Sequence, residues 1–147
     1  MFCKLFVALD GTASSARAME ASIALAKQLG AAITGFVVEP EAHVPVVGTT
    51  LPAYEVATER LIERTDAHAR TLLTAFELKA ETVGKVFTGL HARTDGVECA
   101  IIEQAEESGG VMIVMLSHGR GKFGEFLFGT HTKNVLSSCK LPLLVLH

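Results

Sequence analysis

Short apolar runs alternate with longer amphipathic stretches along this chain. Runs that lack period-two alternation are typical of strands covered on both faces of a parallel sheet. They predict strands at Lys4–Leu9, Ala32–Val38, Glu81–Phe87, Val111–Leu116 and Leu143–Leu146, with a loop at Thr88–Ala92. Because strands and helical patterns alternate, we expect a parallel sheet with helices on both faces and right-handed crossovers.

Apolar residues at helical spacing predict a helix after each of the first four strands. These helices are expected at Ser15–Leu29, at Tyr54–Ala80, from about Thr94 to the Gly109-Gly110 pair, and at Thr130–Ser137. Gly30 follows the first helix, where a left-handed residue often ends a helix, and Thr94 or Asp95 is expected to cap the third. The segment Glu39–Pro52 is rich in proline and has little periodicity, which predicts a surface loop that could act as a lid.

The composition is that of an ordinary globular chain. With 147 residues, 49% of them hydrophobic and 20% charged, residues 1–147 are expected to form one domain. The net charge of −3 argues against a general nucleic-acid binder, which usually carries a basic balance. Three widely spaced cysteines predict neither disulfides nor a zinc site, and no apolar run approaches a membrane span. We therefore expect a cytoplasmic protein with no nucleic-acid or membrane partner.

Polar and flexible residues gather where the predicted strands end. Asp10, Val38 and Ser117 follow or end three strands, and parallel sheets bind ligands at that edge, where the strand order reverses. A glycine-rich loop with two basic residues leads from Ser117 to Thr130, at the start of a predicted helix. Backbone N–H groups, a hydroxyl and the positive end of a helix dipole favour an anion. The loop is therefore predicted to bind phosphate, with a plain structural turn as the alternative.

Two common phosphate-binding motifs fit this loop poorly. Gly119–Gly124 reads as G-x-G-x-x-G, but a dinucleotide-binding fold needs an acid about 20 positions later, and Glu125 is the last acid of the chain. A Walker A loop fails because Phe123 stands where serine or threonine is required. His118 and His131 flank the loop without further metal ligands nearby, so their rings are expected to donate to backbone or phosphate. No catalytic arrangement can be assigned.

The spacing of the loop nevertheless matches a known pattern. Ser117-His118-Gly119, nine residues, Gly129-Thr130 and then a helix resemble the C-terminal signature G-x2-G-x9-G-[ST] of the universal stress protein family. VALDGT near the start is similar to that family's first strand and turn, and KLPLLVLH is similar to its closing proline and strand. The resemblance implies a five-stranded, doubly wound parallel sheet, like that of adenine nucleotide alpha hydrolases, with strand order 3-2-1-4-5. It also implies a homodimer formed through the last strand.

The resemblance further implies a nucleotide site, because one type within the family binds ATP and the other does not. In the ATP-binding type, Asp10 would contact the nucleoside, backbone near Ala8 and Val37 would surround the adenine, and the loop would hold ribose and phosphates. Leu116 stands where the first signature glycine should be, so its side chain either fills ligand space or points into the core. The predicted nucleotide-binding residues are Ala8, Asp10, Val37, Leu116, His118, Gly119, Gly129, Thr130 and His131.

Two functions compete on this basis. The first is a cytoplasmic, homodimeric stress protein that binds ATP or a related adenine nucleotide, with Mg²⁺ positioned by Asp10 through water, and that regulates unidentified protein partners. The second is a dimeric interaction module of the same fold that takes no nucleotide, as Leu116 indicates. A third possibility, an enzyme of the wider adenine-nucleotide-binding group, lacks the SGG-type pyrophosphatase loop and the HIGH-type nucleotidyl-transfer motif. Any catalysis is expected to be slow, incidental ATP hydrolysis.

Overall fold

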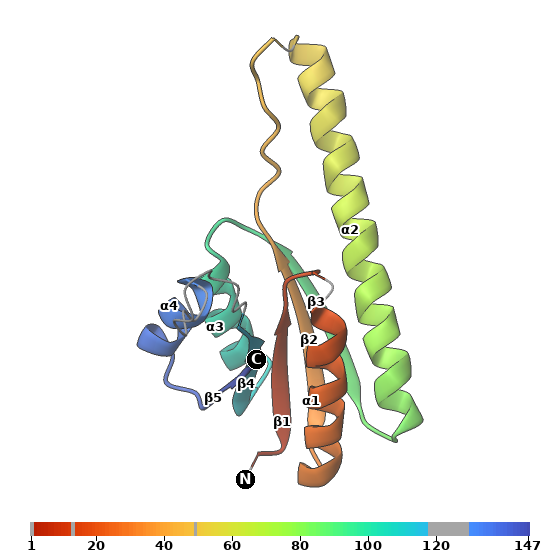
Figure 1. Cartoon of the computed structure of the whole chain (residues 1–147), viewed down its shortest axis with the longest axis vertical. Helices are drawn as coiled ribbons and strands as arrows, with labels where there is room; N and C mark the ends of the chain where they lie inside the picture. Colours follow the sequence, from red (N-terminus) through yellow and green to blue (C-terminus); the bar gives the residue numbers. More distant parts are fainter. Residues whose placement is uncertain (1, 13, 49, 118–129) are drawn as a thin grey trace.

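The computed structural model describes residues 2–12, 14–48, 50–117 and 130–147 of the chain. These residues form a five-stranded sheet with helices on both faces (Figure 1). The strands are β1 Lys4–Leu9, β2 Ala32–Glu39, β3 Phe87–Arg93, β4 Met112–Leu116 and β5 Leu143–Leu146. Neighbouring strands are parallel, and their order is β3-β2-β1-β4-β5. The predicted doubly wound fold and its strand order are confirmed.

The helices cover the sheet in two pairs. Within the described residues they are α1 Ser15–Leu29, α2 Leu51–Thr82, α3 Val97–Glu107 and α4 Thr130–Ser138. Side chains that point to opposite faces of β1 enter two separate cores: Leu5 and Val7 pack with α1 and α2, whereas Phe6 packs with α3 and α4. Both faces of the central strands are therefore buried, which explains why these strands read as continuous apolar runs.

The helix ends follow the prediction in α1 but not in α3. α1 spans the predicted residues and is followed by Gly30, whose φ is 67°. α3 is preceded by Gly96 and has no side-chain cap, so the prediction of a Thr94 or Asp95 cap is wrong. Thr94 Oγ1 instead accepts a hydrogen bond from the N–H of Gly96 at 3.1 Å. Asp95 Oδ1 accepts one from the N–H of Glu41 at 3.0 Å, and thereby anchors the segment after β2.

The third strand is the element that the sequence prediction misplaced. The prediction of a strand at Glu81–Phe87 and a loop at Thr88–Ala92 is wrong, because α2 continues to Thr82 and β3 begins at Phe87. β3 lies at the edge of the sheet, and each of its residues is half-exposed or exposed. A strand in that position needs no apolar run, so its sequence FTGLHAR gave no strand signal. Gly84, with a φ of 69°, lies in the connection that follows α2.

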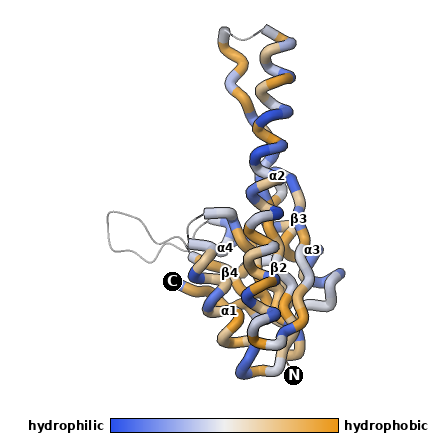
Figure 2. The backbone as a smooth tube through the Cα atoms, turned by 90° about the vertical axis from the view of Figure 1, so that its right-hand side faces the viewer, coloured by the Kyte–Doolittle hydropathy of each residue, from blue (hydrophilic) through white to orange (hydrophobic). Residues whose placement is uncertain are grey.

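The first half of α2 projects far beyond the sheet (Figures 1 and 2). α2 has 32 residues, which is about 48 Å at 1.5 Å per residue, and its buried residues Ala69, Phe76 and Ala80 all lie in its second half. Residues 40–48 run beside the first half of α2, and we call this pair of segments the arm. The arm carries the exposed aliphatic side chains of Val46, Val47, Leu51 and Val56.

The arm also changes the predicted bounds of the loop and of the second helix. The helix begins at Leu51 instead of Tyr54, with Pro52 in its first turn, where a proline removes no helical hydrogen bond. The predicted loop Glu39–Pro52 is correspondingly shorter, and Glu39 belongs to β2. Among the helices of the described residues, none combines the length and the apolar composition that crossing a membrane requires.

Candidate functional site

A cavity of about 180 Å³ lies at the carboxyl ends of β1, β2 and β4, beside α3 and α4. The strand order reverses between β1 and β4, which is where sheets of this kind bind ligands. The lining is mainly apolar and consists of Ala8, Leu9, Asp10, Ser15, Ala18, Val38, Pro40, Val97, Ile101, Met115, Leu116, His131 and Thr132. Pockets that enclose a whole drug-sized ligand measure roughly 300–1,000 Å³. This cavity therefore suits one part of a larger molecule.

The structure places the predicted nucleotide-binding residues in different surroundings. The residues that line the cavity are Ala8, Asp10, Leu116 and His131. Thr130 is exposed at the start of α4, next to His131. The side chain of Val37 is buried in the core under α1 and α2, and its neighbour Val38 lines the cavity instead. The remaining predicted residues, His118, Gly119 and Gly129, lie outside the described part of the chain.

Asp10 is held in a compact turn after β1. Its Oδ1 accepts hydrogen bonds from the N–H of Thr12 at 2.9 Å, from the Thr12 hydroxyl at 2.7 Å and from the Ser15 hydroxyl at 3.4 Å. Gly11 has a φ of 76°, a conformation that favours glycine. From α2, Nε2 of His68 donates to the carbonyl oxygen of Gly11 at 2.8 Å. These contacts fix the orientation of the carboxylate beside the cavity.

The side chain of Leu116 both points into the core and fills ligand space, the two alternatives expected from its position. Its half-buried side chain packs against the core under α1, and it also lines the cavity. The leucine therefore takes up space that a glycine would leave open. Beyond it, Ser117 closes the strand end, because its N–H donates to the carbonyl of Leu146 at 2.8 Å and its hydroxyl lies 2.8 Å from Nδ1 of His147.

A polar cluster that was not predicted joins α3 to α4 beside the cavity. Glu98 Oε1 accepts a hydrogen bond from Asn134 Nδ2 at 2.8 Å and lies 2.9 Å from Nδ1 of His131. The bond from Asn134, followed by a bond from the backbone N–H of Glu98 and the contact with His131, lowers the pKa of Glu98 to about 2. Glu98 is therefore ionised at neutral pH. No motif could have revealed this cluster, because its partners lie 33 and 36 residues from Glu98 in sequence.

Comparison with known proteins decides the family. The model of the universal stress protein family matches residues 1–147. The chain belongs to this family. Universal stress protein YxiE of Bacillus subtilis (strain 168) is 29% identical over 149 residues, which cover 99% of both chains. The sequence resemblance to the universal stress proteins is thus confirmed.

Solved structures of universal stress proteins share the fold at low sequence identity. UspA from Lactobacillus plantarum is 16% identical, with a TM-score of 0.78 over 99% of this chain and 98% of that one. The universal stress protein from Archaeoglobus fulgidus in complex with dAMP is 15% identical, with a TM-score of 0.62 over 100% of both chains. At these identities the likeness establishes the architecture of the sheet and helices.

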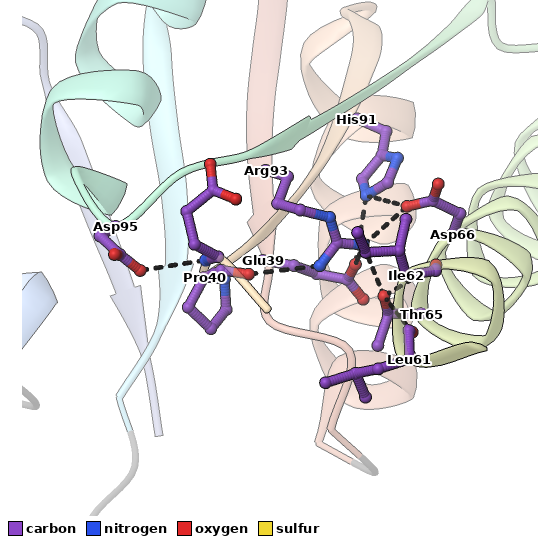
Figure 3. Close-up of polar contacts among 10 residues, drawn as sticks. Glu39, Pro40, Leu61, Ile62, Thr65, Asp66, His91, Arg93 and Asp95 are labelled. Carbon is purple, nitrogen blue, oxygen red and sulfur yellow. Dashed lines mark hydrogen bonds and ion pairs between the residues drawn. The ribbon is translucent and has the colours of Figure 1, made fainter. Parts of the chain in front are cut away.

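In this universal stress protein, a second polar cluster ties α2 to the ends of β2 and β3 (Figure 3). Nη2 of Arg93 donates to Asp66 Oδ1 at 2.7 Å, to Glu39 Oε2 at 3.1 Å and to the hydroxyl of Thr65. The bond from Arg93 is the main cause that lowers the pKa of Asp66. Nη1 donates to the carbonyl of Pro40 at 3.3 Å. Because Pro40 lines the cavity, Arg93 also holds one cavity wall.

The same cluster contains the donor atoms of a metal site, but the positive charge of Arg93 already pairs with its carboxylates. One ligand atom each of Glu39, Asp66 and His91 lies within 4.8 Å of the others, and carboxylates and imidazole bind divalent cations. However, the Arg93 guanidinium already donates to both carboxylates. Its fixed positive charge opposes a metal ion at short range. These residues therefore form an ion-pair network that attaches α2 to the sheet.

Glu98 is expected to stabilise this universal stress protein at neutral pH and much less in acid. Its folded pKa of about 2 lies below the ordinary 4.5, so its contribution is fully present above about pH 4.5 and is lost as the pH falls toward 2. Its side chain is 22% exposed, and Glu98→Gln should lower the free energy of unfolding by about 1–3 kcal/mol at pH 7 and by less at pH 3. Urea titrations of both proteins at the two pH values measure this. Equal losses at both would contradict it.

Proposed function

We propose that the protein is a cytoplasmic regulator that binds ATP or a related adenine nucleotide, and that protein partners recognise its bound state. One observation carries the proposal: an apolar cavity, the Asp10 carboxylate and the start of α4 lie together where the strand order reverses. The Archaeoglobus fulgidus relative in complex with dAMP supports the choice of an adenine nucleotide. Regulation, rather than turnover, is the role proposed for the bound nucleotide.

Each part of a nucleotide has a matching environment at this edge of the sheet. The aliphatic walls suit the adenine, because burying an apolar ring surface removes it from water. The Asp10 carboxylate can accept hydrogen bonds from ribose hydroxyls. The first turn of α4 offers the phosphates the positive end of the helix dipole, the Thr130 hydroxyl and backbone N–H groups that have no partner within the helix. Mg²⁺ would then be shared by the phosphates and, through water, by Asp10.

Titrating nucleotide-stripped protein with ATP and Mg²⁺ tests the proposal. With ATP at about 100 times its Kd, binding should add about 2.7 kcal/mol to the free energy of unfolding. This gain should raise the melting temperature by several degrees. GTP serves as the control for the base, since the cavity walls would have to accept a second exocyclic group. No heat in the calorimeter and no thermal shift at millimolar ATP would refute nucleotide binding.

The alternative function is a dimeric interaction module that takes no nucleotide, and the position of Leu116 in the cavity wall favours it. Leu116→Gly restores the family signature and opens the space. ATP affinity that appears only in the variant would assign the natural protein to the interaction modules. Comparable affinity in both proteins would support the regulator. Melting curves without nucleotide accompany the titration, because the variant also loses apolar burial.

The regulator is proposed to be a homodimer that pairs through β5. β5 has four half-buried residues and lies at the edge of the sheet, and an edge strand presents N–H and C=O groups that can pair with another chain. Two copies related by a twofold axis would join their sheets in this way. Light scattering should therefore give twice the 15.6 kDa mass of one chain. A monomer mass at micromolar concentration would contradict this expectation.

A further inference from the structure

Glu98 determines which nitrogen of His131 carries a hydrogen. Glu98 lies in the first turn of α3, and His131 lies in the first turn of α4. An ionised carboxylate can only accept hydrogen bonds, so the ring of His131 must donate Nδ1–H to Glu98 Oε1, 2.9 Å away. Asn134 Nδ2 donates to the same oxygen at 2.8 Å and holds it in place. The second ring nitrogen, Nε2, is then the one left to interact with a ligand in the cavity that His131 lines.

The surroundings of His131 favour an anion at Nε2. The ring follows Thr130 at the N-terminal end of α4, where backbone N–H groups and the helix dipole attract negative charge. An imidazole that donates from both nitrogens is positively charged. At this place the charge would be balanced by Glu98 on one side and by a ligand phosphate on the other, which makes both hydrogen bonds charge-assisted.

We propose that Glu98 and Asn134 position His131 so that its Nε2 donates a hydrogen bond to a phosphate of the bound nucleotide. The inference rests on the proposed function and deepens it, because it makes the site selective for phosphorylated adenine nucleotides over adenosine. Simple electrostatics give the opposite expectation for Glu98, since a carboxylate near a bound phosphate repels it. Removing the charge of Glu98 therefore weakens ATP binding if Glu98 acts through His131, and strengthens it if repulsion dominates.

Calorimetric titrations with ATP and with adenosine test this. The proteins compared are the wild type, Glu98→Gln, His131→Ala and the double variant. Glu98→Gln keeps the side-chain size and should weaken ATP binding about 3- to 10-fold, while His131→Ala should weaken it about 10-fold or more. Adenosine affinity should change less than about twofold in both, which also shows that the variants are folded. In the double variant, Glu98→Gln should add no further loss, because its effect passes through His131.

Two further measurements separate positioning from a general effect of charge or stability. Glu103→Gln removes the same charge from an exposed position of α3 and should leave ATP binding unchanged. Nitrogen-15 NMR of the unliganded protein should show a hydrogen on Nδ1 of His131 in the wild type. In a Glu98→Ala variant the neutral ring should instead distribute this hydrogen over both nitrogens.

The possible outcomes are distinct. Tighter ATP binding by Glu98→Gln, or an equal ratio of ATP to adenosine affinity in the wild type and His131→Ala, overturns the positioning role. If the wild type binds ATP and all variants bind it equally well, only this inference falls. If the wild type binds no ATP, the proposed function falls and this inference falls with it.

Discussion

Phe76→Ala is expected to lower the free energy of unfolding by about 3–5 kcal/mol. Phe76 is fully buried on α2, and the centre of its ring lies 4.9 Å from that of Phe87 on β3. Gly35 of β2 lies directly against these rings: a Cβ added there would be 2.8 Å from Phe87 and 3.0 Å from Phe76. This contact joins the second half of α2 to the sheet. A truncated side chain would leave a cavity that the rigid strands around it cannot fill.

Urea unfolding of the wild type and the variant measures this loss. Leu78→Ala is the matched control, because Leu78 lies on the same helix but is 58% exposed. Its truncation should cost less than about 1 kcal/mol. Phe76→Leu keeps part of the volume and should fall between the two. Equal losses for Phe76→Ala and Leu78→Ala would contradict the packing described for α2.

Asp10→Ala should weaken ATP binding by about 10- to 100-fold. A hydrogen bond between a charged group and a ligand hydroxyl contributes about 1.5–3 kcal/mol, and Asp10 is the acidic residue among the described residues that line the cavity. The same substitution also removes the acceptor for Thr12 and Ser15. Part of the loss would therefore come from a looser turn after β1.

Asp10→Asn separates these two contributions. The asparagine oxygen can still accept the hydrogen bond from the N–H of Thr12, so the turn should persist while the negative charge is lost. Calorimetric titration with ATP should then show most of the loss seen for Asp10→Ala. Asp95→Ala is the control, since Asp95 bonds Glu41 and His43 and does not line the cavity. ATP binding by Asp10→Ala as tight as that by Asp95→Ala would exclude a direct role for Asp10.

The sequence was sufficient for the fold wherever a strand is buried on both faces. β1 and β2 are such strands, and their apolar runs were placed correctly at Lys4–Leu9 and from Ala32 onward. The third strand was predicted several residues too early in the chain, because an edge strand such as β3 can carry exposed residues such as Thr88 and Gly89. The extent of α2 beyond the sheet was also out of reach, since an amphipathic pattern indicates a helix but not what covers its apolar face.

The candidate site was predictable where a residue's place follows from its own strand. Asp10 and Leu116 line the cavity because each lies at the carboxyl end of a parallel strand. The side chain of Val38 lines the cavity and that of Val37 does not, because successive strand residues face opposite sides of the sheet. The contact of the backbone near Val37 with adenine stays a prediction. The pairing of Glu98 with α4 depends on how two helices pack on the sheet, and no local pattern encodes that distance.

The ion-pair network around Arg93 attaches α2 to the sheet at Asp66, and the first half of the helix extends beyond this attachment point. Leu51 precedes Asp66 by fifteen residues, which is roughly 22 Å along the helix axis. A tilt of about 5° at Asp66 would therefore displace the end of the helix by about 2 Å. His68, which bonds Gly11 in the turn of Asp10, follows Asp66 by two residues, on the side away from Leu51. If a shift of that turn tilted α2 about Asp66, the displacement would be larger at the exposed aliphatic end of the helix than at the turn itself.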